Sequence, residues 1–257
     1  PVTTTLNAGA NNITLTDGAN DFATVVVNGG AGTAQITDTD DIVLGGTGAA
    51  VTNLTVIAGG AVSQSGALSG TTLHVKTTLD GGANITLDTS ANTFTTVSLE
   101  TRNSADGADA AGAIAYDDTG GYDLGTDATG SAGIRTSSTV SLSGAGNLTQ
   151  SGEVIADGAT TTINVGANDI TLTDGGNDFD TVVVNGGAAA VQITDTDDID
   201  LGGTGAAVTS LAVISGGNMS QSGNLVVTGA SSFNAGGNTI SLTDGTNDFD
   251  SDGTGEA

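Results

Sequence analysis

The feature that most constrains this chain is an internal repeat. The sequence ITLTDG at 13–18 returns as ITLD at 85–88, as ITLTDG at 170–175 and as ISLTDG at 240–245. Successive copies start 72, 85 and 70 residues apart. Self-similarity at a nearly fixed period indicates a repeat architecture. A second sequence confirms the period, with SQSG at 63–66, TQSG at 149–152 and SQSG at 220–223.

These spacings divide the chain into three modules of about 71 residues and the start of a fourth. The middle module is longer by roughly 14 residues, which we place as an insertion near 103–133. We expect the whole of 1–257 to form a single β-solenoid. The predicted boundaries are about 6–78, 79–162, 163–232 and 233–249, followed by an acidic tail at 250–257.

The first and third modules are nearly identical, and their few differences show which way the side chains point. Residues 9–57 and 166–214 differ at nine of 49 aligned positions. Val43 becomes Asp200, while the apolar residues on either side of it are kept. Such alternation is typical of a β-strand with one buried face. Glycine-rich segments separate these short strands, as tight turns require.

A module of this size divides into roughly four coils of about 17–22 residues, each too small to bury a core alone. The coils must therefore stack and hydrogen-bond to one another, which predicts an all-β parallel β-helix of about 13 coils, a rod near 60 Å long at ~4.8 Å per coil. Tandem immunoglobulin-like sandwiches are the alternative. They usually need ~100 residues and aromatic core anchors, whereas this chain has five Phe, two Tyr and no Trp.

Three segments resemble the repeats of filamentous haemagglutinin-like exoproteins of the two-partner-secretion type. They are TLNAGANNITLTDGANDF at 5–22, LTVIAGGAVSQSGAL at 54–68 and FNAGGNTISL at 233–242. The resemblance extends over nearly the whole chain, although the enlarged middle module departs from the family pattern. It implies a right-handed parallel β-helix within a very long secreted or surface-attached protein that acts as an adhesin or stalk. It implies no catalytic residue.

The formal net charge is −26, because 29 acidic residues face only three Lys and Arg. Binding to a phosphate backbone depends on cationic side chains, so nucleic acid and anionic membrane surfaces are poor partners. No apolar run approaches the roughly 20 residues needed to cross a bilayer, and we expect no membrane insertion in this segment. The absence of Cys excludes disulfides, thiol catalysis and thiolate metal sites.

Two acidic clusters each place three carboxylates within four residues, at 38–41 and 195–198. Clustered oxygen ligands suit Ca²⁺, and bound cations would relieve self-repulsion. The alternative is a solvated turn, in which Asp bonds to its own backbone. The β-roll calcium motif itself is not present, because GGTGAA at 45–50 and 202–207 carries Ala where a ligand Asp belongs. The hypothetical Ca²⁺ ligands are Asp38, Asp40, Asp41, Asp195, Asp197 and Asp198.

The middle module holds both Arg and both Tyr of the chain. Aromatic and Arg side chains are enriched at recognition surfaces, and insertions in solenoids form loops on one side. We hypothesise a ligand-contacting loop, with a tolerated surface insertion as the alternative. The candidate ligand-binding residues are Arg102, Tyr116, Tyr122 and Arg135.

Two other patterns have simpler interpretations. His74 and Lys76 are two residues apart between the inward Leu73 and Val75, which predicts an exposed pair on the outer face of a strand. Several Asn-x-Ser/Thr triplets are interpreted as turn chemistry and not as modification sites. These triplets begin at Asn12, Asn53, Asn84, Asn147 and Asn218.

Together these observations predict a non-enzymatic structural and adhesive segment of a large bacterial extracellular or cell-surface protein. Its partner would be a protein or glycan on a host or neighbouring cell, and no cofactor would be required. The alternative is a filament or sheath subunit in which identical copies stack end to end through open strand edges. A carbohydrate-active β-helix enzyme, using paired carboxylates, is a third class.

Overall fold

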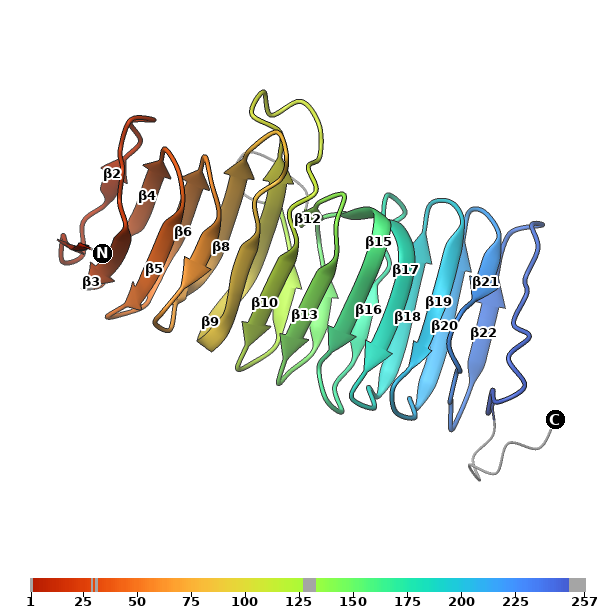
Figure 1. The fold of residues 1–257 in the computed structure, drawn as a ribbon. Coiled ribbons are helices and arrows are strands. Elements are labelled where there is room, and N and C mark those ends of the chain that lie inside the picture. The colour runs from red at the N-terminus through yellow and green to blue at the C-terminus, as the bar shows by residue number, and fades with distance from the viewer. Residues whose placement is uncertain (1, 29, 31, 127–132, 250–257) are drawn as a thin grey trace.

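The chain forms a β-solenoid in which each turn lies on the one before it (Figure 1). This computed structural model describes residues 2–28, 30, 32–126 and 133–249. It has about 11 turns, all built from β-strands, and confirms the predicted parallel β-helix. The predicted acidic tail at 250–257 lies outside the described residues. Within the described ranges, no helix is long and apolar enough to cross a membrane.

Parallel strands form two continuous ladders around one core. Ladder A comprises β1 (Thr3–Asn7), β3 (Thr24–Asn28), β5 (Ile42–Thr47), β7 (Val62–Gln64), the first part of β9 (Ile85–Arg102), β10 (Ile114–Asp118), β13 (Val140–Gly144), the second part of β15 (Val154–Asn164), the second part of β17 (Asp178–Asn185), β19 (Ile199–Thr204) and β21 (Met219–Gln221). Ladder B comprises β2 (Ile13–Leu15), β4 (Thr33–Asp38), β6 (Val51–Ala58), β8 (Ser69–Thr78), the second part of β9, β11 (Tyr122–Leu124), β12 (Ile134–Arg135), β14 (Leu148–Gln150), the first parts of β15 and β17, β16 (Ile170–Leu172), β18 (Ala190–Asp195), β20 (Ser210–Ser215) and β22 (Ser231–Asn234).

Successive modules lie on opposite ladders. Ile13 belongs to ladder B, its copy Ile85 to ladder A and the next copy Ile170 to ladder B again. Ile240 then bridges Met219 of ladder A. A module therefore occupies an odd number of half-turns: seven, from β2 through β8 to β9, which is three and a half turns.

The prediction of four coils per module, and of about 13 coils in all, was therefore too high. Each turn takes about 20 residues, since a module of about 71 residues spans three and a half turns. With about 11 turns at ~4.8 Å between stacked strands, the rod is about 50 Å long.

The core is built from columns of aliphatic side chains that point inward from equivalent positions of successive turns. In ladder B, Leu54 lies over Leu73, and Leu73 lies over Val97. All three are buried, and each such side chain contributes about 1.5–3 kcal/mol relative to exposure. Between the buried Ile199 and Leu201 of β19, Asp200 points outward, which confirms the alternation predicted from the Val43 to Asp200 difference.

Amide side chains link successive turns at the bends between strands, which we call corners. The buried Asn177 donates from Nδ2 to Gln150 Oε1 of the preceding turn (3.1 Å) and to the Thr194 carbonyl of the following turn (3.0 Å). Its Oδ1 accepts from the backbone N–H of Val154 (2.9 Å) and from Gln150 Nε2. Asp195 of the following turn accepts from the Phe179 N–H (2.7 Å).

This corner network, consisting of a Gln, an Asn and an Asp on three successive turns, occurs twice in full and once in part near each end of the described chain. A buried polar group that lacks a partner costs free energy, so the network allows these corners to pack without water. The described copies are Asn20 with Asp38, Gln64 with Asn92 and Asp118, Gln150 with Asn177 and Asp195, and Gln221 with Asn247.

The Asn of four Asn-x-Ser/Thr triplets accepts a backbone N–H from the next turn of the stack, which differs from the local turn chemistry predicted from the sequence. Because Oδ1 is used in this way, these residues help to hold neighbouring turns together. The pairs are Asn12 with Thr33 (3.0 Å), Asn84 with Ala113 (2.9 Å), Asn147 with Asp169 (3.1 Å) and Asn218 with Thr239 (3.1 Å).

We predict that Asn177→Ala destabilises the chain far more than Asn11→Ala. The first change leaves the Gln150 amide, the Val154 N–H and the Thr194 carbonyl without their partner in a buried corner. At about 1–3 kcal/mol for each unmet group, we expect a loss of about 3 kcal/mol or more. Asn11 is exposed, and its side chain bonds only to the Ala8 carbonyl within the same turn (3.0 Å).

The measurement is the free energy of unfolding from denaturant titration of both variants. Equal losses in the two variants would contradict the role assigned to the corner network.

Candidate binding surface

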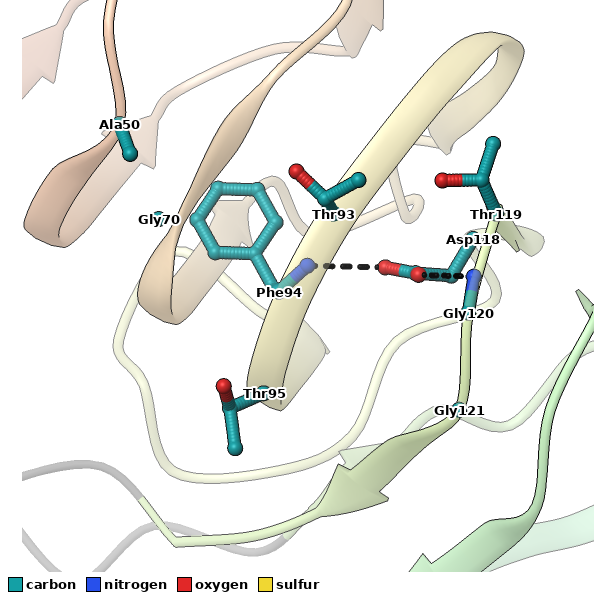
Figure 2. A pocket seen from close by; sticks show the side chains of 9 residues that line it. All are labelled: Ala50, Gly70, Thr93, Phe94, Thr95, Asp118, Thr119, Gly120 and Gly121. Atoms are coloured by element: carbon teal, nitrogen blue, oxygen red, sulfur yellow. Dashed lines mark hydrogen bonds between the residues drawn. The ribbon is translucent and has the colours of Figure 1, made fainter.

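A shallow groove of about 490 Å³ lies at one corner of the middle module, across four successive turns (Figure 2). Ala50 and Gly70 come from the two preceding turns, and residues 93–95 and 118–121 form the rest. Phe94 is the buried floor, whereas Thr93, Thr95 and Thr119 are exposed around it. The groove therefore presents hydroxyl and backbone groups around an apolar floor.

Gly70 makes room for the floor of this groove. Gly70 pairs with Phe94 in the ladder, and a Cβ at position 70 would lie 2.7 Å from Phe94 Cε1 and 2.6 Å from the Val51 carbonyl oxygen. Any other residue here would displace the ring or the strand. The groove thus depends on a small residue in the turn before it.

Asp118 fixes the position of the groove floor through hydrogen bonds. Its Oδ2 accepts from the Phe94 N–H (2.9 Å) and from the Tyr116 hydroxyl (2.7 Å), and its Oδ1 accepts from the Gly120 N–H (2.9 Å). Figure 2 shows the two backbone bonds. Because three donors satisfy this buried carboxylate, it fixes the corner in place and is not available to a ligand.

The same corner carries additional acids in the flanking modules, whereas the acid that lines it in the middle module is the buried Asp118. Asp178 and Asp180 of the third module stand where the middle module has Thr93 and Thr95. Gly120 and Gly121 likewise stand where the third module has Asp197 and Asp198. The first module has Asp40 and Asp41 at these two positions. On a chain with a net charge of −26, the residues that line this groove present no exposed carboxylate, and we call it the neutral groove.

The structure gives the predicted calcium ligands a different role. Asp38 and Asp195 are buried and accept backbone N–H groups from Phe22 and Phe179. Asp41 accepts from the Ala61 N–H (2.7 Å). Asp198 accepts from the Asn218 N–H (2.5 Å), and Asp40 and Asp197 are exposed. In the ranges that the structure describes, no three His, Cys, Asp or Glu side chains are placed to hold a metal ion.

Burial changes the acidity of the carboxylates in the corner network. Loss of water raises the pKa of Asp195 to about 7, even though the N–H groups of Phe179 and Asp197 act in the opposite direction. Burial likewise raises the pKa of Asp38, its counterpart in the first module. The ionised form is thus disfavoured at these positions.

The two tyrosines predicted to contact a ligand lie in the core. Tyr116 and Tyr122 are 1% and 3% exposed, and their ring centroids are 5.1 Å apart in an edge-to-face pair. Burial and the neighbouring Asp118 raise the pKa of Tyr116. In this structure the rings cannot be reached from the surface, so the placement of both residues on an exposed loop was wrong. Their side chains belong to the continuous core, inside the turn formed by β10 and β11.

The two arginines and the single lysine gather on the outer side of β8, β9 and β12 and bind the loop at 103–109. Lys76 Nζ is 2.6 Å from Asp106 Oδ2, and Arg102 Nε is 3.2 Å from Asp106 Oδ1. Arg102 also pairs with Asp109. Arg135 is 3.1 Å from Asp109 Oδ1. These positive charges are compensated, so Arg102 and Arg135 anchor the loop to the rod.

His74 is buried, at 4% exposed, which corrects the expectation that it is exposed beside Lys76. Its Nδ1 lies 3.2 Å from Ser98 Oγ on the next strand. Ser98 is also fully buried. A Ser–His pair is the start of a nucleophilic site, but substrate cannot reach this one in the structure described here.

Sequence reasoning missed the corner network and the neutral groove. A signal for the first was available, because Gln of the SQSG or TQSG sequence and Asn of the NDF or NTF sequence keep a spacing of 26 to 28 residues. That spacing is somewhat longer than one turn of about 20 residues. It would have suggested that the Gln and the Asn lie on neighbouring turns, one above the other. The groove depends on Gly70 and Phe94 pairing across turns, which no single segment of sequence shows.

Comparison with known proteins identifies a family but no individual relative. A family model described as repeats of unknown function (DUF5649) matches residues 2–28, 31–100, 111–185 and 188–254. No curated protein and no solved structure matches the chain. The gap between the second and third matched segments contains the ion-paired loop at 103–109, which indicates that this loop is an addition to the repeat pattern.

We predict that stability falls as the pH rises through the pKa of Asp195. An unfolded Asp titrates near ~3.9, so a folded pKa of about 7 means that the folded state retains this proton to a higher pH. The resulting stabilisation is fully present below about pH 4 and is lost as the pH approaches and passes 7. In Asp195→Asn, a neutral replacement, the pH dependence should weaken by about one proton.

The matched control is Asp17→Asn, since Asp17 is exposed and its side chain accepts a local N–H in the same way (Ala19, 3.0 Å). Melting temperatures from pH 4 to 8 would be compared among the parent chain and both variants. The same slope in Asp195→Asn as in the control would contradict this assignment.

Proposed function

The chain belongs to this family of repeats, and from its architecture we propose that it is a non-enzymatic structural and adhesive segment of a large bacterial extracellular or cell-surface protein. One observation carries the proposal: the described chain forms a single continuous stack whose turns are joined by complete or partial corner networks along its length. Such a stack grows along one axis as turns are added, because each turn contacts only its neighbours. Its simplest use is as a rod that projects a surface.

The charge distribution supports an extended rod in solution. Outward positions carry acids such as Asp123 and Asp200, each held by two hydroxyls of the following turn. A surface with a large excess of negative charge repels other copies and keeps long rods apart. The resemblance of residues 5–22 and 54–68 to filamentous haemagglutinin-like repeats supports the same extracellular role and an adhesin of that type.

We place adhesive contact at the neutral groove of the middle module. A partner that approaches elsewhere meets repeating carboxylates, whereas the groove offers the hydroxyls of Thr93, Thr95 and Thr119 over Phe94. Hydroxyl and backbone groups around an apolar floor suit a neutral, hydroxyl-rich partner such as a cell-surface glycan. The buried Ser98–His74 pair is used for packing in this proposal and not for catalysis.

The test converts the groove into the acidic corner of the third module. The triple change Thr93→Asp, Thr95→Asp and Gly120→Asp introduces the residues found at positions 178, 180 and 197. A Cβ at Gly120 meets nothing closer than 3.6 Å, so the backbone tolerates the change. Adhesion of beads coated with the chain to cells, and to immobilised neutral polysaccharide, should fall about tenfold or more, which corresponds to about 1.4 kcal/mol.

The control adds the same charge at exposed positions outside the groove lining, with Ser141→Asp, Thr209→Asp and Ser232→Asp. Circular dichroism and small-angle scattering verify that every variant keeps the rod. Equal loss of adhesion in both sets would show a general charge effect and exclude the groove. If the parent chain adheres to none of these surfaces, the adhesive role is wrong, whatever the scattering shows about the rod.

A further inference from the structure

The last described turn, residues 233–249, is a copy of two turns elsewhere in the chain. It reads FNAGGNTISLTDGTNDF, against LNAGANNITLTDGANDF at 6–22 and INVGANDITLTDGGNDF at 163–179. Each of the two earlier copies is followed by a turn that covers it, formed by residues 24–38 and 181–195 respectively. The molecule itself therefore shows what covers such a turn.

Equivalent apolar residues differ sharply in exposure between the covered and uncovered copies. Ile13 and Ile170 are 8% and 0% exposed, whereas Ile240 is 43% exposed. Phe179 is 1% exposed and Phe249 is 39% exposed. The Phe249 ring packs edge-on against Phe233, with centroids 5.8 Å apart. The uncovered turn thus presents core side chains to solvent.

The polar half of the corner is also incomplete at this turn. Phe22 and Phe179 each donate their N–H to an Asp of the following turn at 2.7 Å, and the Asn177 amide donates to the Thr194 carbonyl. Asn247 keeps its bond to Gln221 of the preceding turn (3.0 Å). Within the described ranges, Asn247 and Phe249 have no acceptor equivalent to Thr194 and Asp195.

We propose that the face formed by residues 233–249 is a docking surface for one further turn of the sequence type of residues 180–198. That turn would supply an inward aliphatic strand over Ile240, and a buried Asp and a carbonyl for Phe249 and Asn247. The occupant is thus a repeat segment that begins with the Asp-bearing turn. The inference rests on the rod role proposed above and not on adhesion.

A second copy of this chain, stacked by its own first turn, does not meet these requirements. The side-chain amides of Asn92, Asn177 and Asn247 each form a hydrogen bond with a Gln side chain of the preceding turn. Residues 225–249 contain no Gln. The Asn20 amide of a stacked copy would therefore be buried without that partner, at a cost of about 1–3 kcal/mol. The turn that carries the network Asn (the Asn turn) must therefore be followed by a turn that carries the network Asp (the Asp turn).

Two fusions of equal length test this order. Residues 250–257 are replaced either by a second copy of residues 180–249, which begins with the Asp turn, or by a second copy of residues 6–75, which begins with the Asn turn. Each adds 70 residues. We expect amide exchange at Ile240, Leu242 and Phe249 to slow at least tenfold in the first fusion and to stay close to that of the parent chain in the second.

Three results would overturn the proposal. One is the absence of protection in the first fusion, and another is equal protection in both. The third is concentration-dependent protection of Phe249 in the parent chain, which would assign the surface to a second copy and favour the filament alternative. Small-angle scattering, read separately, shows whether the added module lengthens the rod. A failure of turn order is thus distinguished from a failure of the rod role.

Discussion

The structure depends on satisfying amide and backbone groups where a strand bends into the next turn. A stack of aliphatic strands can slide or slip without much change in apolar contact, because its columns resemble one another. The buried Asn177 permits no such slip, since its bonds need Gln150 on one side and the Thr194 carbonyl on the other. Each corner network therefore fixes which turn follows which, and the neutral groove inherits its shape from one of them through Asp118.

The fold was predictable because two signals agree along the whole chain. The repeat of ITLTDG showed that one structural unit recurs, and the tolerance of Val43 for Asp200 showed which face of a strand is buried. The number of coils was not predictable from these signals. Spacing in sequence gives the length of a module but not the number of half-turns it contains. That number comes from the strands between Ile13 and Ile85, which lie on opposite ladders.

The candidate site was predicted less well, for reasons visible in individual residues. Asp38 and Asp40 are close in sequence, but one carboxylate points inward to an N–H and the other lies at the surface. Tyr116 lies two residues from Ile114 and two from Asp118 on the same strand, so all three side chains point inward. Composition alone does not reveal this pattern. The rare residue types, Arg and Tyr, correctly indicated that the middle module differs from the other two. Rarity did not distinguish side chains buried in the core of that module from those on its surface.

The half-integer length of the module separates the unit that is copied in the gene from the unit that is copied in space. Inserting or deleting one module does more than change the length of the rod, because it turns everything beyond that point to the opposite side. Two modules together complete a whole number of turns and restore the original direction. A lineage that gains or loses modules in pairs keeps a surface such as the groove facing the same way, and one that changes by single modules reverses it.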